Sequence, residues 1–369
     1  MSNRDDAIAR LLTRVDATLA QSGHGFPHYC DPAHGEWVRS PAGNWTGGFW
    51  VGMLWLAALK TGRQSYRDEA HAWAARLRPR AGSNSVFKGF LFWYGAGIGE
   101  VLLDDHVARD LAAEGTAGLV RMYNPEARLI PLGTEAEEAS DVGLNEANID
   151  ALPGTIALLY AHGPEAAAIG RNHLLRHIAL CVRDDSSVGQ SATFDPRDGA
   201  LVRRYTHKGI HADSTWGRAQ AWAMIGLAQA LARGETAVQE HAVRIADWWL
   251  AHLPQDGVAF WDFDDPAIPE APRDTSATAI AAAALLKLAA LIPVHRARYA
   301  AAAARSIDAL VAGYLTPTAP DDTRQAGILT AGCFDKRNGV ATKHELIWGD
   351  YFLLEALLAL EGTLVPERV

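Results

Sequence analysis

Trp216-Gly-Arg-Ala-Gln-Ala-Trp222 places aromatic, small and polar residues at the start of an apolar helical run. Comparable stretches begin at positions 45, 89, 150, 275 and 347. They are Trp45-Thr-Gly-Gly-Phe-Trp50, Gly89-Phe-Leu-Phe-Trp93, Asp150-Ala-Leu-Pro-Gly154, Thr275-Ser-Ala277 and Ile347-Trp-Gly-Asp-Tyr351. Each interval holds two helices with their connections, and stacked helix pairs bury a core that one pair alone cannot. The sequence therefore predicts an all-α fold of six helical hairpins closed into a ring, with a polar, aromatic-lined pocket suited to a sugar where these stretches meet.

Length and charge narrow the class of protein. The 369 residues fit one domain, 1–369, because a repeating helical ring uses its whole length around one core. A net charge of −9 disfavours nucleic acid as a partner, since no basic stripe is present to displace counterions from phosphates. The sequence also predicts no membrane span and no secretory signal, and hence a cytoplasmic protein. Cys30, Cys181 and Cys333 are odd in number and widely spaced, as expected of reduced thiols.

Periodic apolar residues predict helices along most of the chain. The predicted ranges are 5–20, 47–60, 65–78, 106–122, 153–161, 166–182, 217–232, 236–252, 276–291, 297–313 and 348–361. Residues 192–205 are predicted to form a β-hairpin around a Pro-Arg-Asp-Gly turn. Two longer polar segments, 133–148 and 254–274, are expected to be loops that overhang the pocket.

Candidate chemistry lies among carboxylates, because the sequence has no GxSxG, Walker-type, HExxH or GxGxxG motif. His173 and His177 lie one helical turn apart, but their helix also carries Leu174 and Leu175, which favours a structural or solvated role. We therefore expect no metal and no cofactor.

Asp150 occupies the first turn of an apolar helix, where an Asp serves either as a helix cap or as a functional carboxylate. Asp213 precedes Trp216 and favours a capping role. Other acids near Trp261 and Trp348 fit structure, solvent or substrate equally well; they are Asp262, Asp264, Asp265, Asp274, Glu345 and Asp350.

Several longer segments resemble the signature segments of unsaturated glucuronyl hydrolases. They are His207-Lys-Gly-Ile-His-Ala-Asp-Ser-Thr-Trp-Gly-Arg-Ala-Gln-Ala-Trp222, Phe260-Trp-Asp-Phe-Asp264 with Arg273-Asp-Thr-Ser-Ala277, and Glu345-Leu-Ile-Trp-Gly-Asp-Tyr-Phe-Leu-Leu-Glu-Ala356. Trp45 to Trp50 and Asp150 extend the match, in the correct order, over nearly the whole chain. The resemblance implies an (α/α)6 barrel that removes a 4,5-unsaturated uronic acid from the nonreducing end of lyase-generated oligosaccharides, so that the partner is an acidic oligosaccharide.

The resemblance also implies roles for particular residues. Asp150 aligns with the general acid/base, which protonates C4 of a vinyl ether while its conjugate base activates the water that adds at C5. A carboxyl against an apolar wall has the raised pKa that this task requires. Trp45 and Trp222 match aromatic positions of the sugar site, although plain core packing explains a Trp equally well, and Arg218 matches a polar position there.

Three positions depart from the family pattern. Phe87 stands where the family has a second active-site carboxylate, Gln190 where a pocket His is usual, and Lys208 where Thr-His-Gln-Gly has its Gln. Lys208 is either a solvent-exposed side chain or a cation for a uronate carboxylate or a sulfate.

These departures leave three interpretations. The favoured one is hydration of an unsaturated uronyl residue by Asp150, with a changed linkage, neighbouring sugar or decoration. In the second, Asp150 and a new partner, Glu146 or Asp213, hydrolyse a saturated glycoside, which requires carboxylates about 6.5–9.5 Å apart in an inverting enzyme. The third is a sugar-binding protein without catalysis. The oligomeric state and the parent polysaccharide are not predicted.

Overall fold

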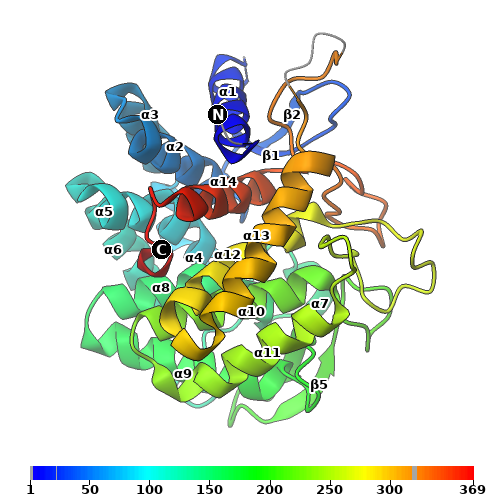
Figure 1. Cartoon of the computed structure of the whole chain (residues 1–369). Helices are drawn as coiled ribbons and strands as arrows, with labels where there is room; N and C mark the ends of the chain where they lie inside the picture. Colours follow the sequence, from blue (N-terminus) through cyan, green and yellow to red (C-terminus); the bar gives the residue numbers. More distant parts are fainter. Residues whose placement is uncertain (1–2, 22, 318–321) are drawn as a thin grey trace.

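Six inner helical segments form a closed ring in the computed structural model, which describes residues 3–21, 23–317 and 322–369. Each inner segment packs against the next, and the last one, α14, packs against the first, α2 (Figure 1). The inner segments are α2 (Gly47–Thr61), the run α4 (Lys88–Phe92), η2 (Trp93–Gly97) and α5 (Ile98–Leu103), α8 (Leu152–Ala161), α10 (Gly217–Ala232), α12 (Thr275–Leu291) and α14 (Ile347–Glu361). The predicted (α/α)6 barrel is thereby confirmed.

Six further helices surround this ring, each packed against an inner helix. They are α1 (Asn3–Ala20), α3 (Gln64–Ala75), α6 (His106–Val120), α9 (Pro164–Cys181), α11 (Gln239–His252) and α13 (Arg296–Gly313). Single turns connect the longer elements: η1 (Arg78–Gly82), α7 (Ala139–Val142), η3 (Ile149–Ala151), η4 (Thr236–Val238), η5 (Pro293–His295) and η6 (Pro366–Arg368). The inner helices are buried nearly all round, whereas outer helices such as α3 and α11 expose one face, as the apolar pattern predicts.

All eleven predicted helices are present, with ends that differ by a few residues. The stretch 89–93 predicted a helical run here, but the range 88–103 was not among the predicted helices, because Gly89, Gly95, Gly97 and Gly99 lower its intrinsic helix propensity. Close packing explains these glycines. A Cβ at Gly99 would lie 2.6 Å from the Trp55 ring, and one at Gly95 would lie 2.8 Å from the Leu77 side chain. Tertiary packing therefore selects a helix that local propensity does not favour.

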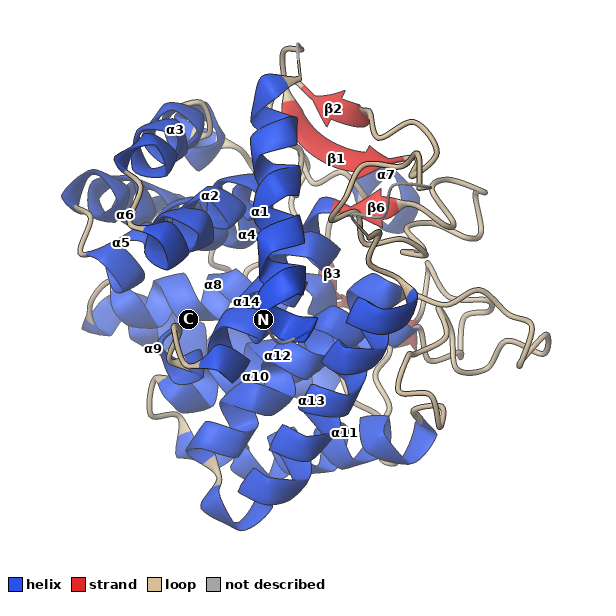
Figure 2. Cartoon of the chain, turned by 45° about the horizontal axis from the view of Figure 1, so that its top comes forward, coloured by secondary structure: helices blue, strands red, loops and turns tan. Residues whose placement is uncertain are grey.

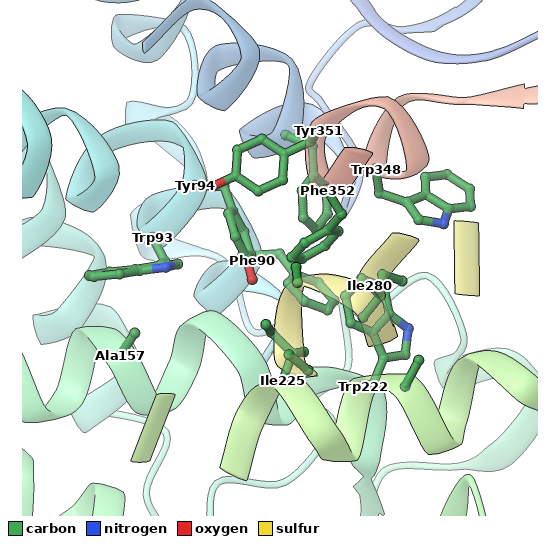
Figure 3. Packing of buried hydrophobic residues seen from close by; sticks show 14 of the residues in the cluster. Phe90, Trp93, Tyr94, Ala157, Trp222, Ile225, Ile280, Trp348, Tyr351 and Phe352 are labelled. Atoms are coloured by element: carbon green, nitrogen blue, oxygen red, sulfur yellow. The ribbon is translucent and has the colours of Figure 1, made fainter. Parts of the chain in front are cut away.

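Aromatic side chains fill the centre of the ring (Figure 3). Phe49 stacks on Tyr94 with ring centroids 4.5 Å apart, and Phe90 lies 4.9 Å from Trp222. Tyr94 and Tyr351 come from opposite ends of the sequence and meet at 4.9 Å. The closed ring thus packs against itself through aromatic residues, and each pair adds about 0.5–1.5 kcal/mol beyond the area it buries.

Gly154 has a structural requirement of its own. Its φ of +72° lies in the left-handed region, and an added Cβ would lie 2.6 Å from the carbonyl oxygen of Gly89. Pro153 and Gly154 have non-helical backbone angles, so the chain is kinked at the start of α8. This kink separates the Asp150 turn from the body of the inner helix.

Two small antiparallel sheets lie beside the barrel (Figure 2). The predicted hairpin is confirmed as β4 (Ser191–Phe194) and β5 (Leu201–Tyr205), to which β3 (Glu146–Asn148) adds a third strand with Asn148 opposite Ser191. The second sheet, β2-β1-β6, was not predicted; it joins β1 (Phe26–Cys30) and β2 (Trp37–Ser40) to β6 (Glu345–Leu346). A two-residue strand such as β6 is too short for a periodic signal in the sequence.

Candidate active site

A small cavity lies where the inner helices begin. Asp150 lies in the turn η3 just before α8, Phe87 directly precedes α4, and Trp216 directly precedes α10. The lining residues are Trp45, Phe87, Phe90, Glu138, Asp150, Lys208, Trp216, Arg218, Trp222 and Phe334. Six of the seven site residues predicted from the sequence are therefore brought together around one cavity, and the seventh, Gln190, touches Asp150.

Asp150 is buried, and its side chain does not cap the helix. The cap is Asn148, whose Oδ1 accepts a 3.0 Å hydrogen bond from the Asp150 backbone N–H. Asp150 Oδ2 accepts a 2.7 Å hydrogen bond from Gln190 Nε2, whereas Oδ1 has no hydrogen-bond partner among the described residues. Burial, together with the negative charge of Glu138, raises the pKa of Asp150 to about 7. The carboxyl is thus poised between its acid and base forms near neutrality.

Gln190 connects Asp150 to the segment after β5. Its amide nitrogen donates to Asp150, and its Oε1 accepts a 2.9 Å hydrogen bond from the backbone N–H of Lys208. Both ends of the amide are therefore satisfied, which fixes its orientation. Gln190 is fully buried and lies outside the cavity lining, so it holds the carboxyl from one side.

Glu138 is a second carboxylate of the cavity, and the sequence analysis did not identify it. Its Oε2 accepts a 2.7 Å hydrogen bond from Asn148 Nδ2 and lies 3.0 Å from His207 Nε2. Its Oε1 lies 3.6 Å from Lys208 Nζ. In the sequence it belongs to the acidic run Glu135-Ala-Glu-Glu-Ala139, which is typical of a solvated surface. The one available signal was its position in the 133–148 loop, and the expectation that this loop reaches the pocket is correct.

Aromatic rings form the apolar wall. Trp45 lies 4.7 Å from Trp348 and 5.7 Å from Phe90, measured between ring centroids. Phe87 stacks parallel to Phe90 at 6.1 Å, with 3° between the ring planes. Phe87 thus continues the aromatic wall at the place where the family pattern has a carboxylate.

Trp222 packs in the core (Figure 3). It also lines the cavity, so the two interpretations of its ring are compatible.

Arg218 lines the cavity, and both terminal nitrogens of its guanidinium bind protein partners. Its Nη1 donates at 2.6 Å both to Asp274 Oδ2 and to the carbonyl oxygen of Cys333, and Nη2 donates at 2.5 Å to the carbonyl oxygen of Phe334. The guanidinium also lies 4.3 Å from the Trp216 ring centroid. Arg218 therefore fastens the 333–334 segment, which carries the lining residue Phe334, to the start of α10.

Lys208 is mostly buried rather than solvent-exposed. Its Nζ lies 3.6 Å from Glu138 Oε1 and 3.4 Å from Asp335 Oδ2, and the exposed fraction of the side chain is 11%. These two carboxylates keep the pKa of Lys208 raised, although burial opposes this. Lys208 also lines a second, more open cavity with His207 and Arg337, so its side chain contributes to both cavities.

The structure corrects other expectations. Asp213 is exposed and does not cap α10, because the N-cap is Trp216, three residues further along the chain. Glu146 accepts a hydrogen bond from the Thr193 hydroxyl within the β3–β4 pair. Neither residue lines the cavity, so neither is the partner of Asp150 expected there.

The 254–274 segment supplies no lining residue, but its last residue, Asp274, holds Arg218 and caps α12.

His173 and His177 are buried and structural. His173 Nδ1 accepts a hydrogen bond from the Ile130 backbone N–H, and His177 Nδ1 donates to the His173 carbonyl oxygen. Burial lowers the pKa of both imidazoles. The three cysteines are free and buried. Within residues 3–21, 23–317 and 322–369, no cluster of three or more His, Cys, Asp or Glu side chains could hold a metal ion. Over the same residues, no helix is both long and apolar enough to cross a bilayer.

An (α/α)6 barrel with a carboxyl in an aromatic-lined cavity is the architecture of a glycoside hydrolase, and the comparisons with known proteins agree. The chain is 34% identical over 367 residues to the unsaturated glucuronyl hydrolase of Bacillus sp. (strain GL1), covering 96% of each chain. It therefore belongs to the unsaturated glucuronyl hydrolase family. It is also 29% identical to the unsaturated chondroitin disaccharide hydrolase of Streptococcus pyogenes serotype M1, over 85% of this chain and 80% of the relative. No protein-family model matches the chain.

Solved structures support the same assignment. The crystal structure of the unsaturated glucuronyl hydrolase from Bacillus sp. GL1 superposes with a TM-score of 0.89 at 33% identity, over 97% of each chain. A variant of such a hydrolase with the oligosaccharide dGlcA-Glc-Rha-Glc has the same TM-score, identity and coverage. An unsaturated glucuronyl hydrolase specific for heparin has a TM-score of 0.86 at 25% identity, over 97% of this chain and 95% of the other.

Proposed function

We propose that Asp150 is the general acid/base of this glycoside hydrolase and that it hydrates the C4=C5 bond of a 4,5-unsaturated uronic acid at the nonreducing end of an oligosaccharide. The observation that carries the proposal is the buried Asp150 carboxyl, which has one oxygen bound to Gln190, the other unpartnered among the described residues, and a pKa raised to about 7 by burial and by Glu138. Such a group donates a proton at neutral pH and accepts one in the next step.

The reaction balances with one carboxyl. Asp150 gives its proton to C4, and the electrons of the double bond form the new C–H bond, so that positive charge develops at C5 and the ring oxygen. The Asp150 carboxylate then takes a proton from a water molecule whose oxygen bonds to C5, which restores the acid. The resulting hemiketal opens and releases the remaining sugar as an alcohol. A second carboxylate at position 87 takes no proton in this sequence of steps.

The remaining site residues are proposed to bind substrate. Trp45 and Trp222 offer apolar faces to the sugar ring, and Phe87 extends this wall. Lys208 has three ammonium donors, of which two face Glu138 and Asp335, leaving one for an acidic group of the substrate. Gln190 and Arg218 are instead proposed to position the site, Gln190 through Asp150 and the lining residue Arg218 through Phe334.

An acidic oligosaccharide is therefore the proposed partner, with no nucleic acid, no membrane and no cofactor involved. The action of residues 1–369 as one catalytic domain and the cytoplasmic location stay predictions from the sequence.

The test is an absorbance assay on a panel of lyase-generated unsaturated disaccharides, with the unaltered protein and Asp150→Asn compared. We expect the ultraviolet absorbance of the conjugated uronate to fall with the unaltered protein. In Asp150→Asn the rate should drop by about 10²–10⁴-fold or more, because general acid catalysis contributes that much. Full activity in Asp150→Asn would overturn the assignment.

If the absorbance does not fall with any substrate, the two other interpretations are favoured. Release of reducing sugar from saturated glycosides, without any change of absorbance, would indicate a conventional hydrolase. Thermal stabilisation by a sugar without product would indicate a binding protein.

A further inference from the structure

Phe87 removes one carboxylate from the site, yet the cavity still contains two. Glu138 comes from the 133–148 loop, a different segment of the chain from the one that holds position 87. It lines the same cavity as Asp150. Asn148 joins the two acids: its Oδ1 accepts from the Asp150 backbone N–H at 3.0 Å, and its Nδ2 donates to Glu138 Oε2 at 2.7 Å. One amide side chain therefore fixes the position of Glu138 relative to the Asp150 turn.

The surroundings of Glu138 keep it ionised although it is buried. His207 Nε2 lies 3.0 Å from Oε2, and Lys208 Nζ lies 3.6 Å from Oε1. Burial opposes ionisation, but His207, Lys208 and the Asn148 hydrogen bond together lower the pKa of Glu138 to about 2. His207 is itself held by Ser191 Oγ at 3.0 Å. Glu138 thus presents a fixed negative charge to the cavity.

Asp150 has the opposite environment. Among the described residues, the charged and titratable groups that face it are Glu138 from the 133–148 loop, His207 from the segment after β5, Arg218 from α10 and Cys181 from the end of α9. Arg218 is already bound to Asp274 at 2.6 Å. Glu138 is the charged group with the largest effect on Asp150, and a like charge favours the protonated form of a carboxyl.

We propose that Glu138 is the second carboxylate of this active site, a positioning residue that acts through Asp150 by holding it in the proton-donating form. The inference rests on the proposed role of Asp150 as the acid. Glu138 takes no proton in the reaction. It supplies from a loop the negative charge that the family pattern places at position 87, while Phe87 turns that part of the wall apolar.

The direct test is a titration of the Asp150 carboxyl, followed by NMR in full-length protein that carries ¹³C at the aspartate side-chain carboxyl carbon. The Asp150 signal is assigned by its loss in Asp150→Asn. We expect the titration midpoint of Asp150 near neutral pH in the unaltered protein. In Glu138→Gln it should be lower by about one pH unit or more, because a nearby charge shifts the pKa of a carboxyl by at least about one unit. Glu138→Asp, which keeps the charge, should leave the midpoint close to that of the unaltered protein.

Glu137→Gln is the matched control. Glu137 is the neighbouring residue, pairs with Arg80 at 3.2 Å and lies outside the cavity, so its substitution should leave the Asp150 midpoint unchanged. An unmoved midpoint in folded Glu138→Gln overturns the proposal.

Should Glu138→Gln fail to fold, Lys208→Gln answers the same question. It removes a cation that faces Glu138, so the midpoint must rise if Glu138 governs Asp150, and an unmoved midpoint again overturns the proposal.

The kinetic readout separates this proposal from the proposed function. Protonated Asp150 is the active form, so the alkaline limb of kcat/KM should move to lower pH in Glu138→Gln by the same shift as the NMR midpoint. A purely structural role of Glu138 would lower the rate at every pH without moving the limb. The titration uses no substrate; hence a moved midpoint without any hydration activity would reject the proposed function and retain the link between Glu138 and Asp150.

Discussion

Gln190 Nε2 donates a 2.7 Å hydrogen bond to Asp150 Oδ2, which places an amide where the family pattern has a histidine. A neutral amide cannot exchange its proton with the carboxyl, so the two residues do not form a titrating pair. In the proposed mechanism Asp150 therefore carries the acid and base steps alone, with Gln190 fixing one of its oxygens.

Replacement of Gln190 by Leu should raise the pKa of Asp150. The hydrogen bond from Gln190 favours the charged carboxylate and lowers the pKa against the larger effect of burial. Its loss should move the alkaline limb of kcat/KM to higher pH by about half a unit to one unit. A pH–rate series with Gln190→Leu and Gln190→Glu measures this, and a limb that moves to lower pH would contradict the assigned donor.

Asp150 should lower the stability of the folded protein at alkaline pH. Its pKa is raised from 3.8 to about 7 on folding, so the folded state binds the proton more tightly than the unfolded chain. Protonated Asp150 therefore contributes fully to the free energy of unfolding below a pH of about 4, and this contribution is lost progressively as the pH rises toward 7. Asp150→Asn removes this penalty, and thermal unfolding should show a gain in Tm that is larger at pH 8 than at pH 5. An equal change in Tm at both values would mean that Asp150 is not held in its acid form.

Lys208→Gln should weaken the binding of acidic substrate. The change removes the ammonium that lines both cavities between Glu138 and Asp335, and a charge-assisted hydrogen bond contributes about 1.5–3 kcal/mol. We expect KM to rise about tenfold or more with a smaller change in kcat. The methyl ester of the same unsaturated uronide is the control, because it lacks the carboxylate charge and should be processed with similar KM by both proteins. An unchanged KM for the acid form would reject the binding role.

Phe87→Asp should lower stability without raising activity. Phe87 is buried, stacks on Phe90 and lies 6.3 Å from Trp45, so a carboxylate there enters an aromatic wall. Loss of the ring and burial of a charge should destabilise the protein by about 3–5 kcal/mol, and Phe87→Leu is the milder control. Thermal unfolding and the absorbance assay together check this. A faster Phe87→Asp enzyme would show that the missing carboxylate limits the reaction and that Glu138 does not replace it.

The barrel was predictable from the sequence because each inner helix starts with a recognisable stretch, such as the one from Trp216 to Trp222, and continues as an apolar run. The start of the run 88–103 was predicted from the stretch 89–93, but its length was not, because its glycines disfavour a helix locally. Close packing explains these glycines, for example Gly99 against Trp55 and Gly95 against Leu77. The sheet around β6 escaped because pairing between residues 29–30 and 345–346 has no local signal.

The sequence by itself determined the helical repeat and the position of Asp150 at the start of an inner helix. Only the tertiary structure decided which acid faces Asp150. Glu138 lies in a run of glutamates with no distinguishing pattern, and Glu146 and Asp213 were equally plausible along the chain. The physical reason is that a carboxyl acquires its role from burial and from the charges around it. For Glu138 the surrounding groups include His207 and Lys208, which are distant from it in sequence and meet it only in the folded barrel.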